Sequence, residues 1–362
     1  MVATDSPYAS RVGLRVLKAG GNAVDAATAV SFALAVTRPY STGLGGGGFL
    51  ILRLGATGET RAFDFRECAP GASTRDMYVT PAARARHGRR PSRNGFLAVG
   101  VPGMVAGRAE VLERYGSKPL AELIEPAIKL ARDGFRVDAD YVKTCRKVLK
   151  IYVGEPRLVE SCHYVYRTHL REGDLRRVGD RLVQPELARL LEAIAVGGAD
   201  VFYRGEVGDA LVDTVRRHGG IITRGDLRRY RVIEREPILA TYRDYGLILM
   251  PPPSSGGVCL AEALNVLETV DLPAIARRDR PLATHYVVEA LKHAFADRAR
   301  WLGDADYATV PVDYLTSKSY ARQLARSLNA NTTHDHDSIY GATRIPDDAG
   351  TSHFCVVDQW GN

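Results

Sequence analysis

One segment near the start of the chain restricts the possible folds more than any other. Asn22 can cap a helix that runs to Thr37, where Thr-Arg-Pro ends it. Its side chains are apolar on nearly every face (Ala26, Ala27, Ala29, Val30, Phe32, Ala33 and Leu34). A helix of this kind is stable only when it is covered all round. We therefore expect it to lie buried between layers of a larger domain.

The composition is that of an ordinary globular protein. The chain has 362 residues, of which 45% are hydrophobic and 25% are charged. Its longest apolar run, 26–36, is shorter than the roughly 20 residues that a membrane-spanning helix needs. The first ten residues, MVATDSPYAS, have neither the basic start nor the apolar stretch of a secretory signal. The sequence thus predicts no membrane span and no signal peptide in this chain.

Hydrophobic spacing predicts a mixture of helices and strands. A strand at 49–54 and an alternating one at 60–67 form a hairpin, and a second strand region begins at Arg231 and turns near Arg243. A short strand is predicted at 353–357. Residues 329–350 have many turn formers and little hydrophobic pattern, which predicts an exposed connector. Helical spacing is present at 7–19, 102–115, 120–132, 139–151, 185–196, 206–218, 255–269, 283–302 and 316–328.

Two patterns in the sequence are typical of nucleotide or nucleic-acid binding, but the residues around each of them do not support that function. Gly43-x-Gly45-x-x-Gly48 matches a dinucleotide fingerprint, but a helix precedes it and a strand comes after it, the reverse of the required order. A close approach of the backbone to a neighbour or a ligand explains the glycines better. The net charge of +7 is densest at 83–93, which has no aromatic residue to stack a base. We expect a solvated loop there and no nucleic-acid partner.

The remaining polar clusters favour neither a metal nor a serine nucleophile. The five cysteines are far apart without a Cys-x-x-Cys pair, so we expect mostly free thiols and no zinc site. The HDHD run at 334–337 lies in the predicted connector, where solvated side chains are the commoner outcome. The PPPSSGGV run at 251–258 can hold an anion at a helix start, but stiff capping explains it equally well. It lacks the Gly-x-Ser-x-Gly elbow of serine hydrolases.

Arg66 is the first candidate site residue. It lies at the end of a strand with aromatic neighbours, in FDFRECAP. A guanidinium held by such packing can bind a substrate carboxylate through two parallel hydrogen bonds. An ion pair with Glu67 or another acid is the simpler explanation, and Arg66 alone does not decide between them.

The junction of Gly350 and Thr351 is the second candidate. A threonine hydroxyl is a poor nucleophile, but an N-terminal threonine has its own α-amine beside it as a base. That amine exists only after the preceding peptide bond is cut. The PDDAG sequence before a strand-leading Thr351 gives the backbone freedom such a cut needs. An ordinary threonine at the start of a strand remains the alternative.

Several motifs, taken together and in order, resemble the gamma-glutamyltransferase family (glutathione hydrolases) among the N-terminal nucleophile hydrolases. The resemblance covers nearly the whole chain and is far more specific than any one glycine loop. The motifs are GGNAVDAATAV, GLGGGGFLI, FDFRECAP, VGVPGMVAG, EPAIKLARDGF, GGIITRGDL, MPPPSSGGV, ADRARWLGD and GTSHFCVVDQWGN.

The resemblance implies an α/β (α+β) fold, a four-layer αββα sandwich that this chain contains only in part. It implies a proenzyme that cuts itself between Gly350 and Thr351, with 1–350 as large-subunit segment and 351–362 as the first strand of the small subunit. Thr351 would attack the γ-glutamyl amide of glutathione or a related compound, and the acyl group would pass to water or an amino acid. Arg66 would bind the glutamate α-carboxylate. No cofactor and no metal are implied.

The resemblance also implies where this sequence departs from the family. The small subunit continues beyond Asn362 in the family, so the 353–357 strand should pair with residues after that point, and this chain should be inactive alone. The start is clipped, Ser352 stands where Thr is usual, and Cys68 stands where Met is usual. Family members are mostly periplasmic or extracellular, although a cytoplasmic location stays open. The alternatives are a non-catalytic remnant, one partner of a split enzyme, or a related acylase.

Overall fold

A computed structural model describes residues 1–88, 90–334 and 351–362. The chain forms two compact units. The first comprises Met1–Gly48, Phe65–Ile233 and 351–362, and the second comprises Phe49–Asp64 and residues from Glu234 to 334. Each is built of helices and short strands, so the predicted mixture of helix and strand is confirmed.

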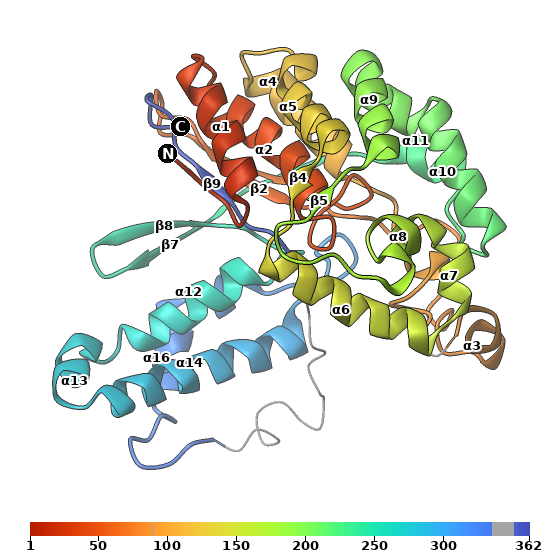
Figure 1. Cartoon of the computed structure of the whole chain (residues 1–362). Helices are drawn as coiled ribbons and strands as arrows, with labels where there is room; N and C mark the ends of the chain where they lie inside the picture. The colour runs from red at the N-terminus through yellow and green to blue at the C-terminus, as the bar shows by residue number, and fades with distance from the viewer. Residues whose placement is uncertain (89, 335–350) are drawn as a thin grey trace. The chain divides into compact units, whose positions relative to one another are not determined.

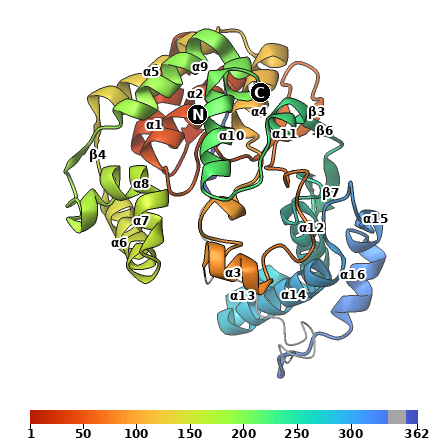
Figure 2. The same cartoon turned by 90° about the vertical axis from the view of Figure 1, so that its right-hand side faces the viewer.

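The first unit is mostly helical. Helices α1, α2, α5 and α9 pack in succession and lie side by side in both views (Figures 1 and 2). Its helices are α1 (Pro7–Lys18), α2 (Ala23–Thr37), α3 (Pro81–His87), α4 (Met104–Tyr115), α5 (Leu120–Asp133), α6 (Ala139–Gly154), α7 (Arg157–Ser161), α8 (His163–Thr168), α9 (Pro185–Tyr203), α10 (Glu206–Arg217) and α11 (Arg224–Arg229), with single 3₁₀ turns at Phe96–Ala98 and Arg171–Gly173.

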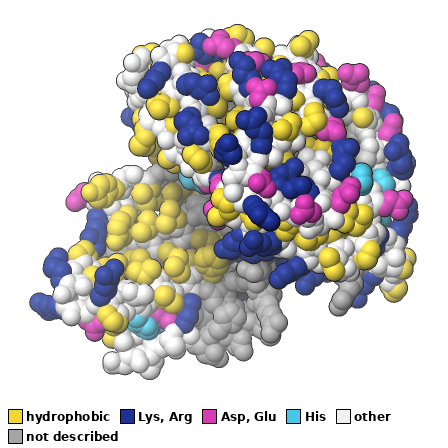
Figure 3. Space-filling view, viewed as in Figure 1, with side chains coloured by type: hydrophobic (Ala, Val, Ile, Leu, Met, Phe, Trp, Pro, Cys, Tyr) yellow, Lys and Arg dark blue, Asp and Glu magenta, His cyan; other side chains and the backbone are white. Residues whose placement is uncertain are grey.

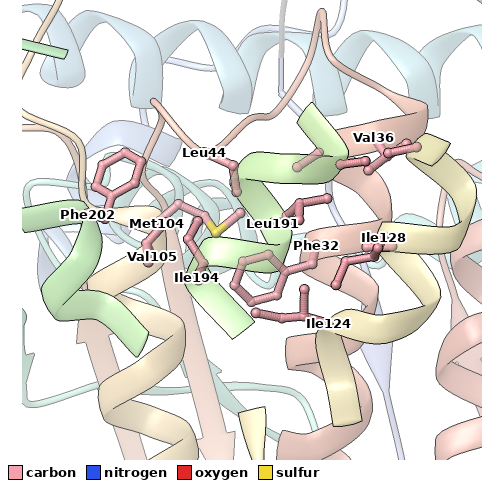
Figure 4. Packing of buried hydrophobic residues seen from close by; sticks show 14 of the residues in the cluster. Phe32, Val36, Leu44, Met104, Val105, Ile124, Ile128, Leu191, Ile194 and Phe202 are labelled. Atoms are coloured by element: carbon pink, nitrogen blue, oxygen red, sulfur yellow. The ribbon is translucent and has the colours of Figure 1, made fainter. Parts of the chain in front are cut away.

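Helix α2 is buried all round, as its sequence predicted. Every residue from Ala23 to Thr37 is buried. The side chain of Asn22 accepts a hydrogen bond from the Asp25 backbone N–H at 3.0 Å, and the Asp25 carboxylate accepts one from the Asn22 N–H at 2.8 Å. Phe32 and Val36 of α2 pack against side chains of α4, α5 and α9 (Figure 4). The helix is therefore the centre of this unit's core.

Two short sheets complete the first unit. Strand β4 (Phe135–Arg136) pairs with β5 (Arg181–Leu182). Strand β1 (Val2–Ala3) pairs antiparallel with β9 (Cys355–Val356), so the two ends of the chain lie together. The sequence predicted that the strand after Thr351 would pair with residues beyond Asn362. The structure pairs one edge of that strand with the start of the chain, and the prediction for residues beyond Asn362 stays a prediction.

The second unit contains two small sheets and the remaining helices. Strands β2 (Phe49–Arg53), β3 (Thr60–Asp64) and β6 (Ile233–Arg235) form one sheet, and β7 (Ile238–Tyr242) and β8 (Tyr245–Leu249) form a hairpin. Arg235 of β6 forms ion pairs of 2.9 Å with Asp64 of β3 in the same sheet and with Asp306 outside it. The helices are α12 (Gly256–Leu267), α13 (Leu272–Arg278), α14 (Arg280–Trp301), α15 (Val312–Leu315) and α16 (Lys318–Ala325). Helices α12, α14 and α16 share a small core of alanine, valine, leucine and cysteine.

One sequence prediction is wrong in the described residues. The basic stretch at 83–93 was expected to be a loop, but helix α3 occupies its first half. Thr80 caps this helix by accepting a hydrogen bond from the Ala83 N–H at 3.1 Å, and Pro81 occupies the first helical position. A capping threonine followed by proline is a typical helix start. The prediction of a loop rested on the many arginines at 83–93 and did not use this signal.

Within the described residues, no helix is long and apolar enough to cross a membrane.

Hydrophobic side chains gather over β7, β8 and α12 in the space-filling view (Figure 3). Leu239, Tyr245 and Leu260 are exposed there.

A buried carboxyl group lies inside the second unit. Glu262 on α12 is 1% exposed. Burial, together with the negative charge of Asp297 on α14, raises the pKa of Glu262 to about 9. Tyr320 on α16 donates a hydrogen bond to Asp297 at 2.5 Å. Burial and the neighbouring carboxylate therefore favour the protonated form of Glu262.

We expect Glu262→Gln to remove a pH dependence of stability. A carboxyl whose pKa is higher in the folded than in the unfolded state stabilises fully below its unfolded value, near 4.5, and loses that contribution as pH rises toward 9. We expect urea unfolding at pH 5, 7 and 9 to give the free energy of unfolding of both proteins. The value for the variant, relative to that of the original protein, should rise by at least about 1.4 kcal/mol from pH 5 to pH 9, which is the equivalent of one pKa unit. Exposed Glu236 provides the control, since Glu236→Gln should leave the pH dependence in place. Parallel curves for Glu262→Gln and the original protein would contradict the assignment.

Candidate active site

The glycine-rich loop at 43–48 lies against the segment that contains Arg66. The backbone groups of Gly48 and Phe65 exchange two hydrogen bonds, of 3.0 and 3.2 Å. At Gly47 an added Cβ would overlap the Phe65 carbonyl oxygen, so no side chain fits there. The predicted close approach of this loop to a neighbouring backbone is confirmed, and the neighbour is the chain around Arg66.

A second loop holds the same segment from the other side. Cys68 and Val101 exchange backbone hydrogen bonds of 3.2 and 2.8 Å. The N–H groups of Gly103 and Met104 both donate to the Gly46 carbonyl at 2.9 Å, which joins the two loops. The backbone from Phe65 to Cys68 is therefore fixed between two loops, while the side chain of Arg66 is exposed.

An open pocket of about 470 Å³ lies over this segment, within the first unit. Arg66, Glu67, Cys68, Ser73 and Tyr78 contribute its polar side chains, and glycine, alanine, valine and proline residues line the rest. A pocket of this size suits a small molecule. Its charged side chains are one guanidinium, that of Arg66, which can bind a carboxylate of a ligand, and one carboxylate, that of Glu67, which can bind a cationic group. All five cysteines, Cys68 included, are free thiols, as the sequence predicted.

Thr351 is exposed at the start of the segment that leads into β9. The next residue, Ser352, donates a hydrogen bond to Asp5 at 3.0 Å. After β9, Asp358 accepts a hydrogen bond from the Ala23 N–H at 2.9 Å, at the N-terminus of α2. Burial opposes the charged form of Asp358, but hydrogen bonds from Asn362, Ala23 and Trp360 prevail and lower its pKa. The strand after Thr351 is thus attached to the helical body at both ends.

Arg108 joins the two candidate segments. Its guanidinium carbon lies 4.9 Å from the centroid of the Phe65 ring and 5.4 Å from that of Phe354. Phe65 precedes Arg66, and Phe354 lies three residues after Thr351. Arg108 is 6% exposed, and burial lowers its pKa to about 10. Stacking of a buried guanidinium on two aromatic rings stabilises their arrangement by about 2 kcal/mol.

The structure therefore relates the two predicted site segments through Arg108. Gly350, the other half of the predicted cleavage junction, lies outside the described residues, as do residues 335–337 of the HDHD run. Among the residues that the structure describes, no group of three or more His, Cys, Asp or Glu side chains is arranged to hold a metal ion.

Comparisons with known proteins identify the family. Residues 9–362 match the family model described as Gamma-glutamyltranspeptidase. The chain belongs to the gamma-glutamyltranspeptidase family. It is 41% identical over 367 residues to the "Glutathione hydrolase proenzyme" of Escherichia coli K12, covering 100% of this chain and 61% of that protein. It is 38% identical to "Glutathione hydrolase 3" of Arabidopsis thaliana, covering 99% of this chain and 54% of that protein. The chain thus spans about three fifths or less of these relatives' length.

Solved structures agree with this membership. The gamma-glutamyltranspeptidase of Helicobacter pylori superimposes with a TM-score of 0.85 at 38% identity, covering 96% of this chain and 97% of that one. The cephalosporin acylase of Bacillus halodurans superimposes with a TM-score of 0.80 at 31% identity, covering 91% of this chain and 59% of that one. The predicted α+β fold of the N-terminal nucleophile hydrolase type is confirmed by these matches.

Sequence reasoning did not find Arg108 or Tyr230 as residues of this site. Arg108 looks like an ordinary polar residue of an amphipathic helix, since its neighbours Arg114 and Glu110 are also charged. The signal available was its position, in the first half of a helix whose other residues on that face are apolar. Tyr230, which contacts the Arg66 backbone, gives no sequence signal of this contact across 164 residues.

Proposed function

We propose that the complete gene product is a γ-glutamyl acyltransferase and hydrolase that acts on glutathione or related γ-glutamyl amides. The observation that carries the proposal is the exposed Arg66, on a backbone held between two loops, in a pocket of the unit that also contains Thr351. A guanidinium on a held backbone in such a pocket can bind the carboxylate of a donor. The names of the relatives, glutathione hydrolases and their proenzymes, support the same donor class.

The proposed chemistry has two stages. In the first, the Thr351 hydroxyl attacks the Gly350 carbonyl, the C–N bond between the two residues breaks, and the hydroxyl proton passes to the released nitrogen. Water then hydrolyses the resulting ester, which leaves a carboxylate on Gly350 and a free α-amine on Thr351. In the second, that amine takes the hydroxyl proton while the oxygen attacks the γ-carbonyl of the donor. The donor's amine leaves with the proton, and water or an amino acid then attacks the acyl ester. Arg66 binds the α-carboxylate throughout, and no metal or cofactor takes part.

We also propose that cleavage between Gly350 and Thr351 divides the chain into parts of two subunits. Residues 1–350 belong to a large subunit, and residues 351–362 begin a small subunit made from the same precursor. We place the activity in the complete precursor product; the family resemblance favours a periplasmic or extracellular location, with a cytoplasmic one as the alternative. Co-expression with a separate small subunit distinguishes a split enzyme from a non-catalytic remnant, since only the former should recover hydrolysis of a γ-glutamyl anilide.

An acylase acting on another amide is the second candidate. Relatives of this kind are the "Acylase ACY 1 proenzyme" of Pseudomonas sp. strain V22, at 39% identity, and the cephalosporin acylase of Bacillus halodurans. Arg66 favours the glutamyl donor, because the α-carboxylate of an amino acid needs a cationic partner. The two candidates differ in the donor and share the nucleophile.

We expect Arg66→Ala, in the complete gene product, to raise KM for a γ-glutamyl anilide about a hundredfold. The loss of one partner of a hydrogen-bonded charge pair costs about 2–5 kcal/mol, and a carboxylate bound equally in ground and transition states shows this loss in KM. Steady-state kinetics measure it. Arg146→Ala, which removes an exposed charge on α6 outside the pocket, is the matched control and should change KM less than about twofold. An unchanged KM for Arg66→Ala would count against the glutamyl assignment.

A further inference from the structure

Tyr230 contacts the backbone of the proposed carboxylate-binding residue. Its hydroxyl donates a hydrogen bond to the carbonyl oxygen of Arg66 at 3.0 Å. Tyr230 is 9% exposed and caps the C-terminal end of α11. The loops around Gly48 and Val101 bond the backbones of Phe65 and Cys68, and the Tyr230 hydroxyl bonds the Arg66 carbonyl between them. Tyr230 therefore completes the fixation of the segment at the residue that matters for binding.

The position of Tyr230 is itself fixed. Its ring stacks on that of Tyr203, with centroids 5.6 Å apart and planes at 19°. The Tyr203 hydroxyl donates to the Pro102 carbonyl at 2.9 Å and accepts from the Ala106 N–H at 3.2 Å. An added Cβ at Gly103 would overlap both the Phe65 carbonyl oxygen and the Tyr230 hydroxyl. The hydroxyl is packed too tightly to move without displacing the segment.

Helix α11 holds the pocket rim at a second point. The Asp226 carboxylate accepts a hydrogen bond from the Gly71 N–H at 3.1 Å and another from the Thr223 hydroxyl at 2.7 Å. Burial raises the pKa of Asp226, but these hydrogen bonds outweigh it and lower the pKa below its usual value. Tyr230 and Asp226 thus hold the two ends of the stretch 66–71, of which residues 66–70 line the pocket.

We infer that Tyr230 is a positioning residue for the carboxylate-binding Arg66. This inference rests on the proposed function, because it takes Arg66 as the group that binds the donor's α-carboxylate. Bidentate recognition by a guanidinium requires placement within about 0.5 Å, and the hydroxyl of Tyr230 supplies part of that placement through the backbone. Tyr230 does not line the pocket, so it acts through Arg66 and not on the donor directly. Its effect should therefore be limited to donors that have the carboxylate.

The test compares two donors in the complete gene product with Tyr230→Phe. One is a γ-glutamyl anilide, and the other is 4-aminobutyryl anilide, the same donor without its α-carboxylate. We expect KM for the first to rise about tenfold, with kcat within about twofold and KM for the second unchanged. The ratio of the two KM values does not depend on the fraction of the variant that is folded. The comparison can therefore be interpreted even when part of the preparation is unfolded.

Tyr152→Phe is the matched control. Tyr152 is also buried and donates to a backbone carbonyl, that of Cys162, at 3.3 Å, but it does not line the pocket. It should leave the KM ratio unchanged. The inference is overturned if Tyr230→Phe leaves the ratio unchanged or shifts both donors equally. If Arg66→Ala leaves the ratio unchanged as well, the carboxylate assignment fails; if only Arg66→Ala changes it, the assignment stands and the role of Tyr230 alone is rejected.

Discussion

Thr351→Ala should abolish both self-cleavage and hydrolysis in the complete gene product. Alanine has no hydroxyl to attack either the preceding carbonyl or the donor, and loss of a covalent nucleophile reduces kcat by on the order of 10⁴-fold or more. The protein should remain a single band on a denaturing gel, and γ-glutamyl anilide turnover should fall to the background rate. Both outcomes result from one missing oxygen atom.

Two further variants test whether the effect belongs to the hydroxyl group of Thr351. Thr351→Ser keeps the hydroxyl and the future amine, so we expect two bands and measurable turnover. Ser352→Ala removes the adjacent hydroxyl, which bonds Asp5, and should reduce kcat by less than about tenfold. A Thr351→Ala protein that still divides into two bands, or an uncut wild-type protein with full activity, is incompatible with an N-terminal threonine nucleophile.

Asp25→Ala should destabilise the first unit more than any surface substitution. The Asp25 carboxylate is fully buried and accepts backbone hydrogen bonds from Asn22, Ser117 and Lys118 at 2.8, 2.8 and 3.1 Å. It also accepts one from the Ser117 hydroxyl at 2.6 Å. These bonds tie the start of α2 to the connection between α4 and α5.

Alanine would leave several buried donors without a partner, each at a cost of about 1–3 kcal/mol. We expect a loss of about 3–6 kcal/mol in the free energy of unfolding, measured by urea titration and followed by far-UV circular dichroism. Asp140→Ala, which removes an exposed carboxylate from the first turn of α6, should cost less than about 1 kcal/mol. Equal losses in the two variants would show that the buried network does not stabilise the unit.

Local signals in the sequence predicted much of the fold. Helix α2 was predictable because a capping asparagine precedes a run that is apolar on every face, and the hairpin of β7 and β8 because alternation breaks at Arg243. Short helices such as α7, α8 and α11 were not predicted, since about five residues give too little periodicity to recognise. The pairing of β1 with β9 was unpredictable for another reason. Two-residue strands at opposite ends of the chain have no local pattern that specifies their register.

The residues of the candidate site likewise include some that the sequence predicted and some that it did not. Arg66 and Thr351 stand out because their residue types suit a definite chemistry and their flanking residues match a family. Arg108 and Tyr230 act through distant partners, a pair of aromatic rings and one backbone carbonyl. Such contacts depend on the packing of α4 and α11, which no short window of sequence contains. Residues proposed to bind or react were thus predictable, whereas residues that position them were not.

The pairing of Val2 with Val356 also bears on the order of events during folding. Contacts between residues so far apart in sequence have a large loop-closure cost and form after local ones. Helices can assemble while the strand beside Thr351 is still loose, and that strand is immobilised only when the two ends of the chain meet. Thr351 would therefore reach a defined geometry only after the segment around Val2 has docked, which would place the proposed self-cleavage late in folding.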